Sequence, residues 1–164
     1  MGLDIIPKHS EITYHRSYSA LHLVRRLAFT YMNIPKPVIE ALFCRNDHID
    51  VYDYNMYCRA RDINKEKLTI TPTDLYNLVI VGYKFPNLLF HSDCEGSYTA
   101  NSSVMQETNW ETGNIYGLND ELTLLYNHFK DTNITEVEGF HVLSQLQQLV
   151  EDECRYDDPV IEFH

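Results

Sequence analysis

The sequence lacks any apolar run that approaches the roughly 20 residues needed to cross a lipid bilayer. Its first residues, Met1-Gly2-Leu3-Asp4, lack the basic and then apolar pattern of a secretory signal peptide. Ile6 stands where a myristoylation signal has Ser or Thr. We therefore expect no membrane partner and predict a cytoplasmic protein.

The cysteines show no metal-binding pattern. None of Cys44, Cys58, Cys94 and Cys154 belongs to a Cys-x-x-Cys pair, so zinc-ribbon and zinc-finger spacings are excluded. A chain of this size without a secretory signal more often keeps its thiols reduced than forms disulfides. We expect Cys44, Cys58 and Cys154 to act as small buried apolar groups.

Several catalytic and nucleotide-binding motifs are also missing. The chain has no Gly-x-Ser-x-Gly elbow, no phosphate-binding glycine-rich loop, no His-Glu-x-x-His and no EF-hand pattern. It has no internal repeat and no low-complexity linker. With 164 residues it has the length of one domain, so we predict a single domain over residues 1–164.

Negative charge is abundant and unevenly distributed. The net charge is −11, from 13 basic and 24 acidic residues. Residues 1–84 hold 11 basic and 9 acidic residues (+2), whereas residues 85–164 hold 2 basic and 15 acidic residues (−13). Nucleic acid is thus a disfavoured partner, because the second half has almost no cations to displace phosphate counterions. This half could instead attract a basic partner or a metal cation, or simply aid solubility.

Hydrophobic periodicity predicts both helices and short strands. Strands are expected over residues 3–6, 11–15, 88–91 and 160–163, and helices from Ser17 or Ser19 to Tyr31 and over 38–42, 71–81, 118–130 and 135–150. The elements do not alternate regularly, so we predict an α+β fold. Four or five helices should pack on a small mixed or antiparallel sheet that includes residues 3–6, 88–91 and 160–163. Residues 45–67 show neither a helical nor a strand period.

The densest group of ligand-type side chains is His91-Ser92-Asp93-Cys94-Glu95-Gly96, directly after the apolar run Leu88–Phe90. In an extended segment His91, Asp93 and Glu95 share one face, because strand side chains alternate. One imidazole and two carboxylates form a plausible half-site for a divalent cation. The missing ligands would come from the amino-terminal region, where the candidates are Asp4, His9 and His15.

The same segment has simpler interpretations. In a tight turn, Ser92 and Asp93 would hydrogen-bond loop amides, Gly96 would take a positive φ and Cys94 would be buried. A nucleophilic Cys94 is disfavoured, because Asp93 and Glu95 would raise its pKa by repulsion. We therefore predict no catalytic residue. The ligand-binding candidates are His91, Ser92, Asp93, Cys94, Glu95 and Asp4, of which His91, Asp93 and Glu95 are the metal candidates.

One cluster in the first half is basic. Its members are Lys8, His9, His15, Arg16, His22, Arg25 and Arg26. Such a cluster could meet an anionic small molecule or an acidic partner, or it could pair with the acids of the chain itself. The many acids of the second half favour internal pairing.

Several short stretches resemble a loosely defined group of small bacterial and phage proteins without an established activity. The stretches are Met1-Gly2-Leu3-Asp4, Ser17-Tyr18-Ser19, His91–Gly96, the helix around Leu118–Leu125 and the ending Pro159–His164. The resemblance implies a prokaryotic or phage origin, a cytoplasmic location and an α+β domain. It transfers no catalytic residue.

Three hypotheses about function follow. The first is a non-enzymatic binding protein with a site for a small-molecule ligand or a protein partner near residues 91–99. The second is a metal-dependent hydrolase-like enzyme that uses His91, Asp93 and Glu95 with Asp4. The third is an acidic phage-encoded inhibitor that imitates nucleic acid through its second half.

Overall fold

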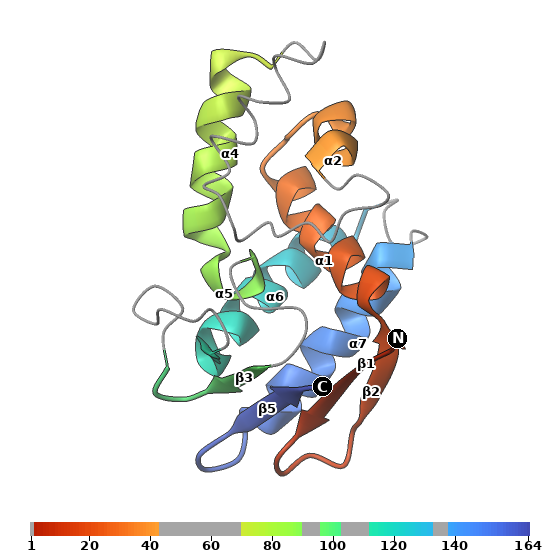
Figure 1. The fold of residues 1–164 in the computed structure, drawn as a ribbon, viewed down its shortest axis with the longest axis vertical. Coiled ribbons are helices and arrows are strands. Elements are labelled where there is room, and N and C mark those ends of the chain that lie inside the picture. Colours follow the sequence, from red (N-terminus) through yellow and green to blue (C-terminus); the bar gives the residue numbers. More distant parts are fainter. Residues whose placement is uncertain (1, 43–69, 90–95, 103–111, 133–137) are drawn as a thin grey trace.

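The computed structural model of the protein describes residues 2–42, 70–89, 96–102, 112–132 and 138–164. In these ranges the chain forms six helices and five strands (Figure 1). The strands are β1 (Gly2–Pro7), β2 (Tyr14–Ser17), β3 (Gly96–Thr99), β4 (Thr112–Asn114) and β5 (Val160–Phe163). The helices are α1 (Tyr18–Tyr31), α2 (Lys36–Leu42), α4 (Pro72–Lys84), α5 (Pro86–Leu89), α6 (Ile115–Phe129) and α7 (Glu138–Glu153).

The strands form one mixed sheet in the order β2-β1-β5-β3-β4. Strand β1 is antiparallel to β2 and to β5, with Ile5 opposite Phe163. Strand β3 is antiparallel to β5 and parallel to β4, with Gly96 opposite Phe163. The two ends of the chain therefore pair with each other in the interior of the sheet.

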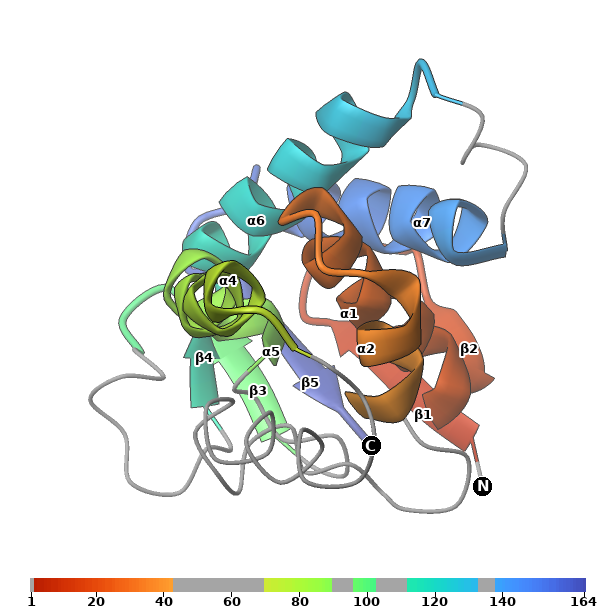
Figure 2. The same cartoon turned by 90° about the horizontal axis from the view of Figure 1, so that it is seen from above.

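Alternation along the strands separates a core face from an outer face. Leu3 and Ile5 of β1 are buried, as are Ile161 and Phe163 of β5. Their neighbours Asp4, Ile6, Glu162 and His164 are exposed on the opposite face. Figure 2 shows α1, α6 and α7 together on one side of the sheet, and their buried residues share one core cluster with those of the strands.

The helices bury the apolar stripes that their sequence predicts. In α1, Leu21, Val24, Leu27 and Ala28 belong to the core. In α7, Leu143, Leu146, Leu149 and Val150 do the same. The buried apolar residues form one cluster shared by the sheet and the helices. The predicted α+β class is thus confirmed.

The predicted strand over residues 88–91 is wrong for the part that the structure describes. Pro86–Leu89 forms the short helix α5, and the strand begins only at Gly96. The apolar run allowed both interpretations, since a short buried run fits a strand or a helix. Pro86 suits the first turn of a helix, because its missing N–H needs no partner there. The sequence also did not predict β3 and β4.

Some predicted boundaries differ as well. The second strand begins at Tyr14 rather than at residue 11, and α6 begins at Ile115 rather than at Leu118. Helix α4 starts close to the predicted position, and Thr71 and Asp74 form a capping box there. It does not stop at Gly82 but runs to Lys84, and Gly82 is a buried residue of the helix without the positive φ that often ends one.

No helix among the described residues combines the length and the apolar character that a bilayer span requires.

Candidate functional site

The predicted site lies mostly outside the described residues, which exclude His91, Ser92, Asp93, Cys94 and Glu95. Asp4 is described, and it lies on the outer face of β1. Its Oδ1 contacts Nδ1 of His15, which stands opposite Asp4 on β2. Asp4 therefore contacts His15, one of the two histidines that the sequence offers as further ligands of the predicted metal site.

The register separates Asp4 from the start of β3. The backbones of Asp4 and His164 exchange hydrogen bonds of 2.9 Å in both directions, so β5 lies between β1 and Gly96. Two strand spacings amount to roughly 10 Å. Within the described parts of the chain, no group of three His, Cys, Asp or Glu side chains could hold a metal ion. The metal site at His91, Asp93 and Glu95 stays a prediction.

A buried polar network lies on both sides of residues 90–95. Glu121 of α6 accepts hydrogen bonds from the backbone N–H of Asn87 (3.0 Å to Oε1 and 3.2 Å to Oε2) and of Leu88 (3.2 Å). Both residues belong to α5, which ends one residue before this segment. The carboxylate thus satisfies N–H groups of the first helical turn that have no partner within the helix.

Three further groups complete this network. The Tyr98 hydroxyl on β3 donates to the Asn87 carbonyl at 2.7 Å, and Nε of the buried Arg25 donates to the Leu88 carbonyl at 2.9 Å. The Asn114 N–H donates to Oδ1 of Asn87 at 2.9 Å. The chain before residues 90–95 is therefore tied to α1, α6 and β4, and the strand after them is tied to α5 through Tyr98.

Burial perturbs the central carboxyl group of the network. It raises the pKa of Glu121 from 4.5 to about 8, although the hydrogen bonds from Asn87 and Leu88 oppose the change. Glu121 is only 6% exposed, so a bound molecule would have little access to it. We interpret Glu121 as a residue that holds the first turn of α5 in place through its hydrogen bonds.

Replacement of Glu121 by glutamine is expected to weaken the pH dependence of stability. Because the folded pKa lies above the unfolded one, folding takes up a proton between pH 4.5 and about pH 8, and stability falls as pH rises through this interval. The wild-type loss from this group over the whole interval is at most about 5 kcal/mol. Urea denaturation at about pH 5.5 and about pH 8.5 measures it.

The control for this experiment is Asp131→Asn, which removes an exposed carboxylate beyond the end of α6. It should keep the pH dependence of the wild type. If Glu121→Gln and wild type lose equal stability between the two pH values, the ionisation of Glu121 does not contribute to the pH dependence of stability.

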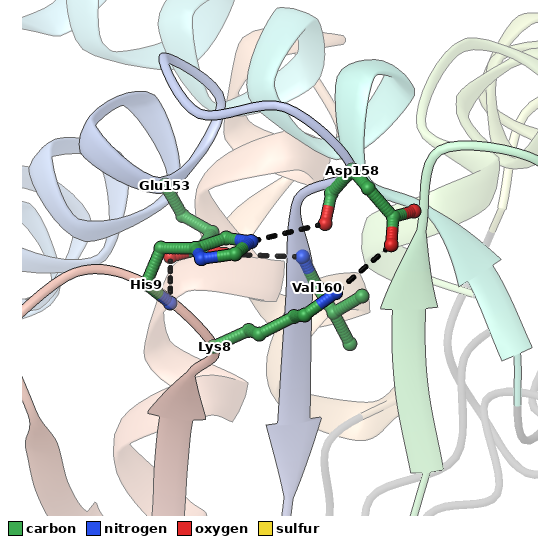
Figure 3. A network of polar contacts seen from close by, with 5 residues as sticks. All are labelled: Lys8, His9, Glu153, Asp158 and Val160. Atoms are coloured by element: carbon green, nitrogen blue, oxygen red, sulfur yellow. Dashed lines mark hydrogen bonds and ion pairs between the residues drawn. The ribbon is translucent and has the colours of Figure 1, made fainter.

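A second buried carboxylate, Glu153, joins the two ends of the chain (Figure 3). Its Oε2 accepts from the backbone N–H of His9 (2.9 Å) and of Ser10 (2.8 Å), and its Oε1 accepts from Val160 (3.1 Å). Glu153 is fully buried. The last residue of α7 thus fixes both the β1–β2 turn and the start of β5.

Neighbouring acids also serve internal contacts. Asp152 accepts from the Ser10 hydroxyl at 2.5 Å, and Asp158 pairs with Nζ of Lys8 at 2.9 Å, as Figure 3 shows for the second pair. The hydrogen bond and charge of Lys8 lower the pKa of Asp158. These contacts involve only two of the acids of the second half, and the inhibitor hypothesis stays a prediction.

Cys154 is half-buried and belongs to the periphery of the core. Burial, with the nearby charges of Glu153, Asp120 and Glu151, raises the pKa of its thiol to about 11. Such a thiol is almost entirely protonated near neutral pH and therefore a poor nucleophile. This agrees with the predicted structural role, whereas Cys44, Cys58 and Cys94 lie outside the described residues.

The structure also contains a cavity of about 630 Å³ at the junction of α1, α2 and the first turn of α7. Its lining consists of Leu23, Arg26, Leu27, Thr30, Asn33, Ile34, Lys36, Ile39, Glu40 and Gly139. Helix α1 ends at Tyr31, and Ile34 is buried in the short connection to α2. The cavity lies where the chain turns from one helix into the other.

Asn33 gives this turn its shape. Its φ is +57°, in the left-handed region that Asn tolerates better than most residues, and its N–H donates to the Thr30 carbonyl at 3.0 Å. The Ile34 N–H then donates to the Phe29 carbonyl at 3.1 Å. The sequence prediction included Arg26 as part of a basic cluster but missed the cavity, because its walls come together only through this turn.

Comparison with known proteins finds no matching family model, curated protein or solved structure. The resemblance to small bacterial and phage proteins therefore stays a prediction.

Proposed function

We propose that this protein is a non-enzymatic binding protein that holds a small molecule in the cavity between α1 and α2. The observation that carries this proposal is the cavity itself, about 630 Å³ in volume with walls from both helices. Small-molecule sites in proteins typically enclose roughly 300–1,000 Å³ and have mostly apolar walls with a few polar groups. The volume of the cavity and the largely apolar residues that line it both fit this description.

The chemistry of the lining supports binding rather than catalysis. Among the described residues that line the cavity, the only carboxylate is Glu40, and it pairs with Lys36. The Thr30 hydroxyl donates to the Arg26 carbonyl at 3.2 Å, as helical Thr often does. A general base next to a nucleophile, the usual basis of covalent catalysis, is not found among these side chains.

A second candidate is the predicted site at His91–Glu95. The network around Asn87 supports it, since a binding loop needs well-fixed ends and both flanks of this segment are held by buried hydrogen bonds. On this alternative the ligand is a divalent cation or a small molecule, and the hydrolase-like chemistry stays a prediction. We also propose a cytoplasmic location and a bacterial or phage origin, on the basis of the sequence resemblance alone.

Filling the cavity is expected to weaken binding. Fragments of about 10–15 heavy atoms, a size suited to such a site, should shift the amide resonances of Leu23, Leu27 and Ile39 in ¹H–¹⁵N spectra. Thr30→Trp places an indole in the cavity and should weaken these fragments at least about tenfold, the loss expected from 1.4 kcal/mol. Thr123→Trp, at a half-buried position on α6, is the matched control. Fragments that leave the cavity amides unchanged, or that bind Thr30→Trp as well as wild type, would contradict the proposal.

A further inference from the structure

We infer that two copies of this protein associate through the solvent-facing side of α4, with their two α4 helices antiparallel about a twofold axis. The inference is independent of the cavity between α1 and α2. It follows from two exposed tyrosines on α4, from the uncharged residues between them and from the symmetry of their positions along the helix.

The outer side of α4 carries a stripe of aromatic and aliphatic side chains. Tyr76 and Tyr83 are 66% and 70% exposed, more than any other large hydrophobic residue among those that the structure describes. They lie about two helical turns apart, and the half-buried Val79 and Ile80 lie between them on the same face. Leu78, on the opposite face of the helix, is fully buried. Figure 1 shows α4 at one side of the molecule, where this stripe is open to a partner.

The stripe is uncharged although the chain is strongly acidic. Residues 76–83 contain no charged residue, and the whole of α4 has only Asp74 and Lys84. Asp74 belongs to the capping box at the start of the helix, and Nζ of Lys84 lies 5.2 Å from the centre of the Tyr31 ring. The solvent-facing side of a surface helix usually carries charged residues, whereas the centre of a protein interface is enriched in tyrosine and depleted of charge. The stripe therefore has the composition of an interface.

The symmetry of the stripe favours a second copy of this chain as the partner. Tyr76 and Tyr83 are equally far from the point midway between Val79 and Ile80. A twofold axis through this point, perpendicular to α4, places Tyr76 against Tyr83 of the second copy and Val79 against Ile80 of the second copy. In such an isologous contact each interaction occurs twice, so one helical face supplies both halves of the interface.

The area of the stripe suits a weak dimer. An aromatic side chain can bury about 150–250 Å², so four tyrosines at their present exposure contribute roughly 400–700 Å². Val79 and Ile80 of both copies add to this area. The total lies at the low end of specific interfaces, below about 1,200 Å², where association is typically transient. We expect a dissociation constant on the order of 10–100 μM.

Salt is expected to strengthen this dimer. Two copies with a net charge of −11 each repel one another at long range, and dissolved ions screen this repulsion. The contact between the two stripes involves no charged residue of the segment 76–83, so screening removes little attraction. The dissociation constant should therefore fall several-fold between about 50 and 500 mM NaCl, whereas an interface held by ion pairs would weaken.

Sedimentation velocity of the full chain at about 5–500 μM tests the inference, and the average mass should rise toward twice that of the monomer. Tyr76→Glu and Tyr83→Lys should each weaken self-association at least about tenfold, because each removes an aromatic contact and places a charge against tyrosine. An equimolar mixture of these two variants should associate again, since the new carboxylate of one chain lies opposite the new ammonium group of the other. Tyr116→Glu, at a 45% exposed position on α6, is the matched control and should associate like wild type.

The mixture tests the antiparallel arrangement, and renewed association also shows that both variants are folded. In a parallel pair of helices Tyr76 would face Tyr76 of the second copy, so a mixture no better associated than the single variants would overturn the arrangement. A wild-type chain that is monomeric at about 500 μM would overturn the inference and leave the stripe to a different protein or to solvent. Equal effects of Tyr76→Glu and Tyr116→Glu, or a dimer that weakens with salt, would also overturn it.

Discussion

Glu153→Ala is expected to destabilise the protein by about 4 kcal/mol, a large fraction of the 5–15 kcal/mol typical of a domain. The substitution removes a fully buried carboxylate that accepts hydrogen bonds from three backbone N–H groups. His9, Ser10 and Val160 would then have donors without a partner, each at a cost of about 1–3 kcal/mol where water cannot replace the acceptor. Guanidinium denaturation followed by circular dichroism measures the change.

A graded series tests this explanation even if the alanine variant fails to fold. In Glu153→Gln one oxygen can still accept from His9 and Ser10, but the new amide group faces the N–H of Val160. We expect about half the loss of the alanine variant. Glu151→Ala removes an exposed carboxylate two residues earlier on α7 and should change stability by less than about 0.5 kcal/mol. A Gln variant as stable as wild type would show that the contact with Val160 adds nothing.

Gly117→Ala is expected to destabilise the protein by about 3 kcal/mol, although alanine favours a helix over glycine by about 1 kcal/mol. A Cβ at this position would lie 2.3 Å from Nδ2 and 3.2 Å from Cγ of Asn87. The Asn87 side chain is buried and accepts from the Asn114 N–H, so it cannot move without breaking the network. Chemical denaturation of the variant measures the loss.

Gly139→Ala is the matched control for this substitution. A Cβ there would lie 3.3 Å from the Leu23 carbonyl oxygen, a contact that a shift of a few tenths of an ångström relieves. We expect a change within about 1 kcal/mol, since helix propensity offsets the crowding. The double variant Asn87→Ala/Gly117→Ala should be little less stable than Asn87→Ala alone. Additive losses would show that Gly117 acts through something other than Asn87.

Much of the fold could be predicted from the sequence because its signals are local. The stripe of Leu143, Leu146 and Leu149 identifies α7, and the alternation at the two chain ends identifies β1 and β5. The capping box of Thr71 and Asp74 gives the correct start of α4. Each of these signals lies within a few residues of the element it specifies.

The run Leu88–Phe90 shows where local signals were insufficient. Its apolar residues fit a strand or a helix, and the N–H groups of Asn87 and Leu88 are satisfied by Glu121, 34 and 33 residues away. Nothing in the neighbouring sequence indicates that acceptor. The predicted site followed from residue types around Asp93, and the part of it that the structure describes, Asp4, contacts His15 on the adjacent strand β2.

The sequence by itself determined the α+β class, the amphipathic helices and the concentration of acids in the second half, because periodicity and composition need no knowledge of distant contacts. Only the tertiary structure decided which acids are buried. Glu121 and Glu153 look like any other acid in the sequence, yet each satisfies backbone amides far away in the chain, up to 144 residues for Glu153 and His9. The cavity depends on tertiary structure for the same reason, because α1 and α2 border it only after the turn at Asn33 brings them together.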